Sequence, residues 1–189
     1  MEIWEAIRGR RSVGRVSAEP VAREKIEQIL EAANWAPSHH GTEPWRFYVM
    51  TGAGRDVLAR AYGDVAAHQA GGTLDAEARA KHGAKAYRAP VVIAAAVSPS
   101  ADPKVIAQEE YAAAHAAVQN LLLAVHAIGL AAIWRSGEPM YHPAMAEAFG
   151  LSEGEALVGL LYIGHPEVPQ QEGRRRPTAD KTVWLTGEE

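Results

Sequence analysis

The stretch 117–137, AVQNLLLAVHAIGLAAIWRSG, contains two elements of different apolar pattern. Residues 117–128 form the second half of a helix that the sequence predicts over residues 104–128. Gly129 follows as a typical C-terminal cap. Residues 131–136 then have the composition of a buried strand. The end of that strand brings Trp, Arg, Ser and Gly to the place where open α/β sheets bind ligands. The stretch therefore predicts a long helix packed on a sheet, followed by a candidate binding loop.

The region 111–134 contains no Asp, Glu, Lys or Arg and is long enough to span a bilayer. Four polar side chains interrupt it, however, and much of the remainder is alanine, which contributes little transfer energy. A buried helix followed by a strand explains the pattern better, and we expect no membrane partner. The small side chains of residues 112–117 would let another helix approach closely, which makes this a candidate core or dimer helix.

Three further segments have the composition of strands. Residues 45–51 (WRFYVMT) are rich in aromatic side chains, while 90–97 and 156–163 are continuous apolar runs, typical of strands buried on both faces. Other predicted elements are short helices at 2–9, 21–35, 55–62 and 145–149, a mobile segment or lid at 63–88, and a tail at 164–189. No repeat or change of composition marks a second domain.

The composition is that of an ordinary folded protein. Among 189 residues, 19 Lys and Arg against 23 Asp and Glu give a formal net charge of −4. This mild acidity argues against broad nucleic-acid binding, which needs a concentrated basic face. The chain has no cysteine, so any redox chemistry must belong to a bound cofactor. Because the N-terminus lacks an apolar segment of signal-peptide length, we expect a cytoplasmic protein.

Three familiar site patterns fit poorly. Gly52 and Gly54 lie between a predicted strand and helix, as in a dinucleotide fingerprint, but Val57 stands at the third glycine position. His39 and His40 are adjacent and would point in different directions, and no other histidine spacing suits a metal. No GxSxG elbow indicates a hydrolase. We favour a glycine turn, structural histidines and no metal site.

A compact basic cluster follows the first helix. Arg10, Arg11 and Arg15 surround Ser12. Guanidinium groups bind phosphate bidentately, and a serine adds a neutral donor. If this cluster stood alone, a solvated surface patch would be the simpler interpretation.

Four motifs in order connect this cluster with the rest of the chain. They are RRSVGR (10–15), APSHHGTEPWRF (36–47), the stretch 117–137 and LVGLLYIGHP (157–166). Together they resemble the nitroreductase family of FMN-dependent NAD(P)H oxidoreductases, especially its short, single-domain branch. The first resembles the family's RRSxR motif, the second its APSxxNxQPWxF block, and the third its long central helix with a W-R-[ST]-G turn.

The resemblance implies an α+β fold with three α-β-α layers. A mixed central sheet flanked by helices is expected, and residues 1–189 would form a single nitroreductase-like FMN-binding domain. The resemblance also implies a homodimer that associates through the long central helix and the C-terminal tail, with two FMN sites at the subunit interface.

Carried over by position, the resemblance assigns the cofactor contacts. Arg10, Arg11 and Ser12 would contact the phosphate and the pyrimidine side of FMN, and His39 would lie beside the flavin of the other subunit. The opposite edge of the cofactor would be lined by Trp134, Arg135, Ser136 and Gly137. Residues 174–176 (RRR) loosely resemble the family's C-terminal phosphate contact.

Two departures from the family pattern involve three positions. Gly41 and Glu43 stand where the family usually has Asn and Gln, so the contacts on the substrate side are expected to differ. Trp35 stands where some relatives have a basic residue, and we favour interface packing over ligand stacking for its ring.

The implied reaction is a ping-pong transfer of hydride. NADPH or NADH would reduce flavin N5, and an electron acceptor such as a nitroaromatic or quinone would then take the electrons. No side chain need act as an obligatory acid or base, and Arg10 or Arg11 could stabilise negative charge on the reduced flavin. The alternatives are a non-catalytic flavin-binding or storage module, or a flavin enzyme of this fold with other chemistry, such as dehalogenation or flavin breakdown. The sequence leaves open the acceptor and the choice between NADH and NADPH.

Overall fold

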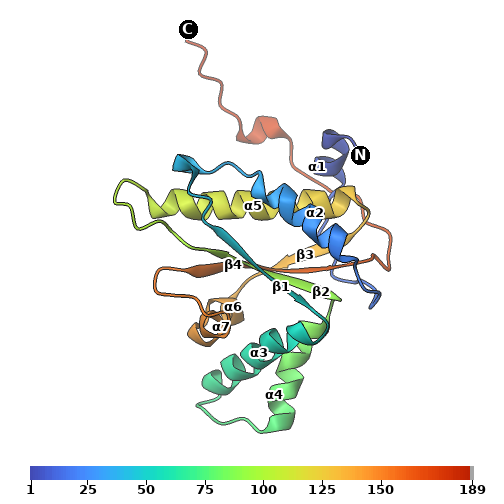
Figure 1. The fold of residues 1–189 in the computed structure, drawn as a ribbon. Helices are drawn as coiled ribbons and strands as arrows, with labels where there is room; N and C mark the ends of the chain where they lie inside the picture. The colour runs from blue at the N-terminus through green and yellow to red at the C-terminus, as the bar shows by residue number, and fades with distance from the viewer. Residues whose placement is uncertain (188–189) are drawn as a thin grey trace.

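A four-stranded sheet lies at the centre of the molecule (Figure 1). The structure is a computed structural model that describes residues 1–187. In spatial order the strands are β1 (Trp45–Thr51), β2 (Val91–Val97), β4 (Ala156–Gly164) and β3 (Ala131–Arg135). All three neighbouring pairs are antiparallel. The parallel component of the expected mixed sheet is a single bridge between Ser12 and Ala132 at the β3 edge.

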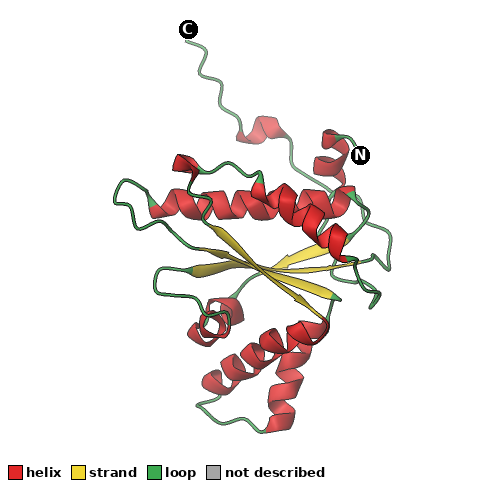
Figure 2. Ribbon diagram, in the orientation of Figure 1, coloured by secondary structure: helices red, strands yellow, loops and turns green. Residues whose placement is uncertain are grey.

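Helices cover both faces of the sheet, as Figure 2 shows. One face carries α5 (Ala107–Ala127) and α2 (Arg23–Asn34), with α1 (Ile3–Gly9) against α5. The other face carries α3 (Asp56–Gln69), α6 (Glu138–Tyr141) and α7 (Pro143–Ala148), and α4 (Ala76–Gly83) packs on α3. This arrangement confirms the predicted α+β fold with three layers.

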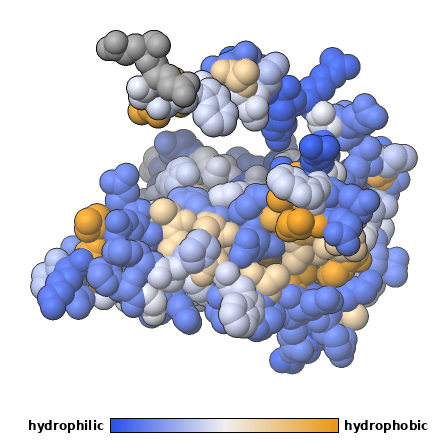
Figure 3. Space-filling model, turned by 90° about the horizontal axis from the view of Figure 1, so that it is seen from above, coloured by the Kyte–Doolittle hydropathy of each residue, from blue (hydrophilic) through white to orange (hydrophobic). Residues whose placement is uncertain are grey.

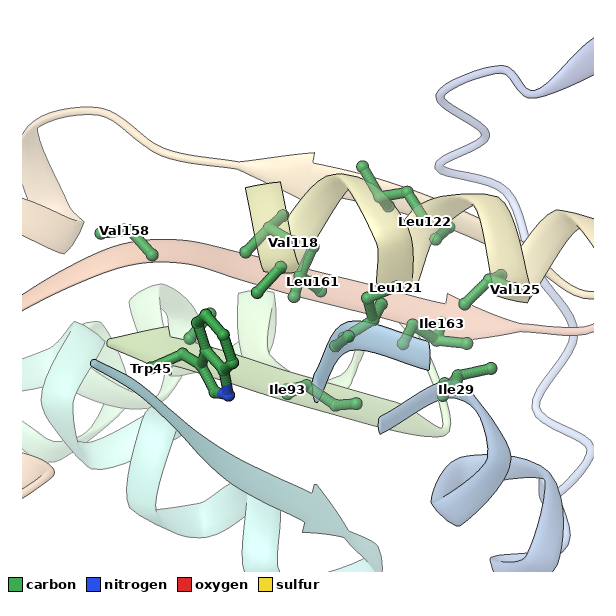
Figure 4. Packing of buried hydrophobic residues seen from close by; sticks show 14 of the residues in the cluster. Ile29, Trp45, Ile93, Val118, Leu121, Leu122, Val125, Val158, Leu161 and Ile163 are labelled. Carbon is green, nitrogen blue, oxygen red and sulfur yellow. The ribbon is translucent and has the colours of Figure 1, made fainter. Parts of the chain in front are cut away.

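Two apolar clusters fill the spaces between these layers. On the α5 face, Ile93 and Leu161 of the sheet meet Leu121 of α5 and Ile29 of α2 (Figure 4). On the α3 face, Leu58 meets a second set of sheet residues that includes Val92, Leu160 and Tyr162. Because neighbouring residues of β2 and β4 enter different clusters, both strands are buried on both faces, as their continuous apolar runs predict.

The segment 63–88 differs from the prediction. Instead of ending at Tyr62, α3 continues to Gln69, and α4 returns antiparallel to it. A Cβ at Gly83 would lie 2.8 Å from the backbone oxygen of Ala59, so the glycine lets the two helices approach closely. The glycines therefore mark a helical hairpin: Gly71 and Gly72, with φ of +84° and +105°, form its turn.

The remaining bounds agree closely with the sequence pattern. Each of the four strands begins and ends within one residue of its predicted limits, and the long helix is shorter than predicted at its N-terminal end. The short helix predicted at 145–149 is α7, which begins at Pro143 and follows the one-turn α6. Among the residues that the structure describes, none of the helices has the length and apolar character that a membrane span requires.

Candidate functional site

The basic cluster begins where α1 ends. Gly9 lets the end of α1 lie close to α5, because a Cβ at this position would be only 2.6 Å from Nε2 of His126. The guanidinium of Arg11 donates from Nη1 to the backbone oxygen of Arg10 over 2.6 Å and lies against Gly173 of the tail, where no Cβ would fit. The chain thus brings its N-terminal arginines and its C-terminal tail together, although they are far apart in the sequence.

Positive charge accumulates at this point, and Arg10, Arg11 and Arg175 form no salt bridge within residues 1–187. Partial burial lowers the pKa of Arg10, and the charges of Arg11 and Arg175 lower it further. Partial burial likewise lowers the pKa of His126, with Arg10 and Arg11 acting in the same direction. Nε of Arg11 is buried and has no hydrogen-bond partner among the described residues. We call Arg10, Arg11, Arg175 and His126 the basic end of α5, and its chemistry suits an anion.

The segment after Arg11 runs beside the edge strand β3. Ser12 pairs in parallel with Ala132, and the backbone N–H of Val13 donates to the oxygen of Ala132 over 2.9 Å. Gly14 lies beside β3, where an added Cβ would be at ordinary contact distance, 3.5 Å, from Nη2 of Arg135. RRSVGR and WRSG, two separate motifs of the sequence, are therefore neighbours in the fold.

A cavity opens between this segment and the tail. Its volume is about 640 Å³, within the range of small-molecule sites. It is lined by Arg11, Ser12, Val13, Gly14, Arg15, Val168, Pro169, Gln170, Gln171 and Glu172. Arg15, part of the sequence cluster, instead turns to Glu167, its Nε lying 3.1 Å from Oε2.

A bulge in β4 fixes the side chains at the end of β3. The pairing register of β2 and β4 shifts so that Val158 has no partner residue on β2. The indole Nε1 of Trp134 donates to the oxygen of Val158 over 3.0 Å, and its ring covers Gly159, where a Cβ would not fit. Trp134 also stacks on His115 of α5, with 5.8 Å between ring centroids. Its ring therefore packs towards α5.

Because successive side chains of a strand point to opposite faces of the sheet, Arg135 faces away from α5, opposite to Trp134. The guanidinium carbon of Arg135 lies 5.6 Å from the ring centroid of Tyr162, in the apolar cluster on the α3 side. Ser136 is exposed, and Gly137 has a φ of +108°, which glycine adopts without strain. The four residues WRSG therefore face different surroundings, although the resemblance assigns all of them to one cofactor edge.

His39 lies at the other end of α5. Its Nε2 is 3.5 Å from Oε2 of Glu109, while the basic end includes His126, 17 residues further along the helix. At 1.5 Å per residue, 17 residues span about 25 Å. Within one chain, the structure therefore does not bring His39 together with Arg10 and Arg11.

A buried carboxylate holds the loop that carries His39. Glu110 is fully buried and accepts hydrogen bonds from Oγ1 of Thr42 (2.6 Å) and from the backbone N–H of Ser100 (3.1 Å). The loop contains two non-glycine residues of positive φ, His40 (+59°) and Glu43 (+47°). Glu43 stands where the family usually has Gln, and its backbone N–H donates to Ser38 over 2.9 Å. We call His39, Glu109, Glu110 and Thr42 the acidic end of α5.

Sequence reasoning did not identify several of these groups. It weighed His126 only as a metal ligand and did not name Glu110, because nothing in the sequence shows which polar residues of α5 are buried. It also passed over Lys85, Arg88 and the two tyrosines that lie near Arg135. Within residues 1–187, no three His, Cys, Asp or Glu side chains gather as a metal site requires.

A known protein family matches most of this chain. The model of the Nitroreductase family matches residues 7–165. The chain belongs to the nitroreductase family. Over 188 residues it is 33% identical to the Escherichia coli K12 protein named "Putative NAD(P)H nitroreductase YdjA", which covers 98% of this chain and 99% of the relative.

Two solved nitroreductase-type structures extend the comparison. A nitroreductase-like family protein from Bacillus cereus is 29% identical, with a TM-score of 0.84 over 99% of this chain and 97% of the other. A "putative nitroreductase in complex with fmn" from Desulfovibrio desulfuricans is 30% identical, with a TM-score of 0.74 over 97% and 96% of the two chains. These relatives share the fold along nearly their whole length.

Proposed function

We propose that the chain is an FMN-dependent oxidoreductase that passes hydride from NADPH or NADH to a small electron acceptor, such as a nitroaromatic or a quinone. The observation that carries this proposal is the basic end of α5. Arg10, Arg11 and Arg175 gather there without an acidic partner, and Arg11 Nε is buried and unpaired within the described residues. The FMN complex of the Desulfovibrio desulfuricans relative supports the choice of anion.

The residues present fit FMN. Arg10, Arg11 and Arg175 would hold its phosphate through charge-assisted hydrogen bonds, and Ser12 would add a hydroxyl. Gly14 lies beside Ile133 and Arg135 of β3, and Ser136 and Gly137 follow the end of that strand. Bound FMN would supply the atom that accepts and returns hydride in a ping-pong exchange. The protein would bind and orient the reactants, and solvent would supply protons.

A homodimer would complete this site. His39 lies about 25 Å along α5 from the basic end, so it would reach the flavin only from a partner subunit. Apolar surface is available for such an interface: Ala112 on α5 is exposed, Trp35 is 79% exposed and Trp184 in the tail is 82% exposed. Figure 3, which looks onto the α2 and α5 face, shows pale orange surface between hydrophilic margins. Pairing through α5 and the tail would cover it.

The test is a visible spectrum of the purified protein followed by reduction. We expect a flavin absorption band, loss of that band on addition of NADPH or NADH, and its return with a nitroaromatic or quinone. A colourless protein that takes up no added FMN would overturn the proposal. Bound flavin that neither nicotinamide reduces would favour a storage module, and reduction without turnover of such acceptors would favour other flavin chemistry. Cytoplasmic localisation stays a prediction.

A further inference from the structure

A second group of cations surrounds a recess on the α3 face of the sheet, which we call the tyrosine recess. Its volume is about 410 Å³. Its lining residues are Tyr62, Lys85, Arg88, Ile133, Trp134, Arg135, Ser136, Pro139, Met140 and Leu160. Three of these carry positive charge, and none of the described residues in the lining is acidic.

One lining residue, Tyr62, pairs with a second buried tyrosine, Tyr162. The hydroxyls of Tyr62 and Tyr162 lie 3.1 Å apart and hydrogen-bond to each other. Burial raises the pKa of both phenols, and the charges of Arg135 and Arg88 counteract this rise only in part. Both groups therefore stay neutral at physiological pH. Because one hydroxyl donates to the other, the second keeps an O–H that can donate to a ligand.

Lys85 and Arg135 lie close to the rings of this tyrosine pair. Nζ of Lys85 lies 5.6 Å from the ring centroid of Tyr62, and the guanidinium carbon of Arg135 lies 5.6 Å from that of Tyr162. Within residues 1–187, neither these two groups nor Arg88 forms a salt bridge, and Nε of Arg135 is buried without a hydrogen-bond partner. Three unneutralised cations at one recess favour binding of an anion.

The walls restrict the shape of that anion. Ile133, Met140 and Leu160 contribute apolar surface beside the cations. Such a combination suits a flat apolar group that ends in an oxyanion better than a small inorganic ion. The recess also reaches Ser136, the strand-end residue that the proposed function places at the flavin.

The phosphate of FMN does not account for this second cluster. FMN carries one phosphate, and the basic end of α5 supplies Arg10, Arg11 and Arg175 for it. We propose that the tyrosine recess binds the oxyanion group of the second reactant, through Lys85 and Arg88 with the Tyr62 hydroxyl. The oxyanion could come from the carboxylate of an aromatic electron acceptor or from the 2′-phosphate of NADPH. The inference rests on the proposed function in that the reactant must meet the flavin beside Ser136.

Calorimetric titration of the full-length protein as purified, with its bound cofactor, tests this inference. Benzoate is compared with benzamide, its neutral analogue, and NADP⁺ with NAD⁺, which lacks the 2′-phosphate. The variants are Arg88→Gln and Lys85→Gln, and the matched control is Lys81→Gln, an exposed lysine of α4 outside the recess. Titration needs no turnover, so its outcome is independent of whether the protein reduces nitroaromatics.

We expect the member of one pair that carries the additional oxyanion to bind about tenfold more tightly than the member that lacks it, and each recess variant to lose most of this preference. Unchanged affinity for the member without that oxyanion shows that the variants are folded, and Lys81→Gln should behave like the wild type. Selectivity within the benzoate pair identifies an acceptor carboxylate, and selectivity within the nucleotide pair identifies the 2′-phosphate. Equal affinities within both pairs, or preferences that survive both variants, would overturn the inference. So would loss of FMN from the recess variants without any change in these preferences.

Discussion

The two ends of α5 differ in charge and in how they are held. The basic end carries Arg10, Arg11 and Arg175 around His126, whereas the acidic end carries Glu109 and Glu110 beside His39. Backbone pairing with β3 holds the first, and a buried carboxylate holds the second. An antiparallel pair of α5 helices in a two-fold dimer would place the basic end of one chain near the acidic end of the other. The comparison suggests that one chain carries two unlike halves of a site.

The largest expected effect concerns the basic end. Arg10→Ala and Arg11→Ala should each weaken FMN binding about tenfold or more, because each removes charge-assisted hydrogen bonds to the phosphate. Arg46→Ala is the control, since Arg46 pairs with Glu155 over 3.1 Å away from this cluster. Fluorescence titration of FMN onto the cofactor-free protein measures the effect. Equal FMN affinities for the three variants would show that the basic end does not bind the phosphate.

Substitution of Glu110 at the acidic end should lower the free energy of unfolding. Glu110→Ala would leave the Thr42 hydroxyl and the Ser100 N–H unpaired in a buried place, at a cost of about 1–3 kcal/mol in the free energy of unfolding. Glu110→Gln keeps one carbonyl acceptor and should lose less. Urea unfolding compares the two. If Glu110→Ala is as stable as Glu110→Gln, the carboxylate does not hold the loop.

Acid should destabilise the basic end through His126. Burial first, and then Arg10 and Arg11, lowers the pKa of His126 in the folded chain below the ordinary value near 6.5. The unfolded chain therefore takes up this proton first, and stability falls as pH drops through the ordinary histidine range. His126→Gln should reduce the difference in Tm between pH 7.5 and 5.5, whereas His82→Gln, at an exposed site, should not. An unchanged difference in His126→Gln would contradict this assignment.

The smallest effect is expected for the pair of His39 and Glu109. Their side chains are 59% and 42% exposed, so solvent screens the interaction at 3.5 Å. Glu109→Gln should change the free energy of unfolding by less than about 0.5 kcal/mol, in contrast with its neighbour Glu110. A loss as large as that of Glu110→Ala would mean that both carboxylates hold the loop.

The extent to which the sequence could predict this structure depends on periodicity and on distance along the chain. The continuous apolar runs of β2 and β4 identify strands buried on both faces, and both strands agree with the prediction. The α3–α4 hairpin was missed because the polar, Ala-rich segment 63–88 with its Gly71-Gly72 pair resembles a mobile loop, whereas Gly63 and Gly83 serve close helix packing. Motifs also name candidate site residues such as Arg10 and Ser12, and their role in binding stays a prediction.

Other parts could not be found from the sequence because the fold alone assembles them. In the fold, Lys85, Arg88 and Arg135 lie near Tyr62 and Tyr162. The two tyrosines are 100 positions apart in the sequence, so no local spacing predicts that these residues come together. Glu109 and Glu110 are neighbours of the same residue type, yet only Glu110 is fully buried. Which of them faces the core depends on how α5 lies over Thr42 and Ser100.

Native mass spectrometry of the purified protein tests most directly whether the two ends of α5 meet between subunits. We expect a species of two chains with two FMN molecules, which separates into chains and cofactor on denaturation. In the double variant Arg10→Ala/Arg11→Ala, the pair of chains should persist with less FMN. A single chain that carries one FMN would contradict the account, because a site complete within one chain leaves His39 without its proposed role.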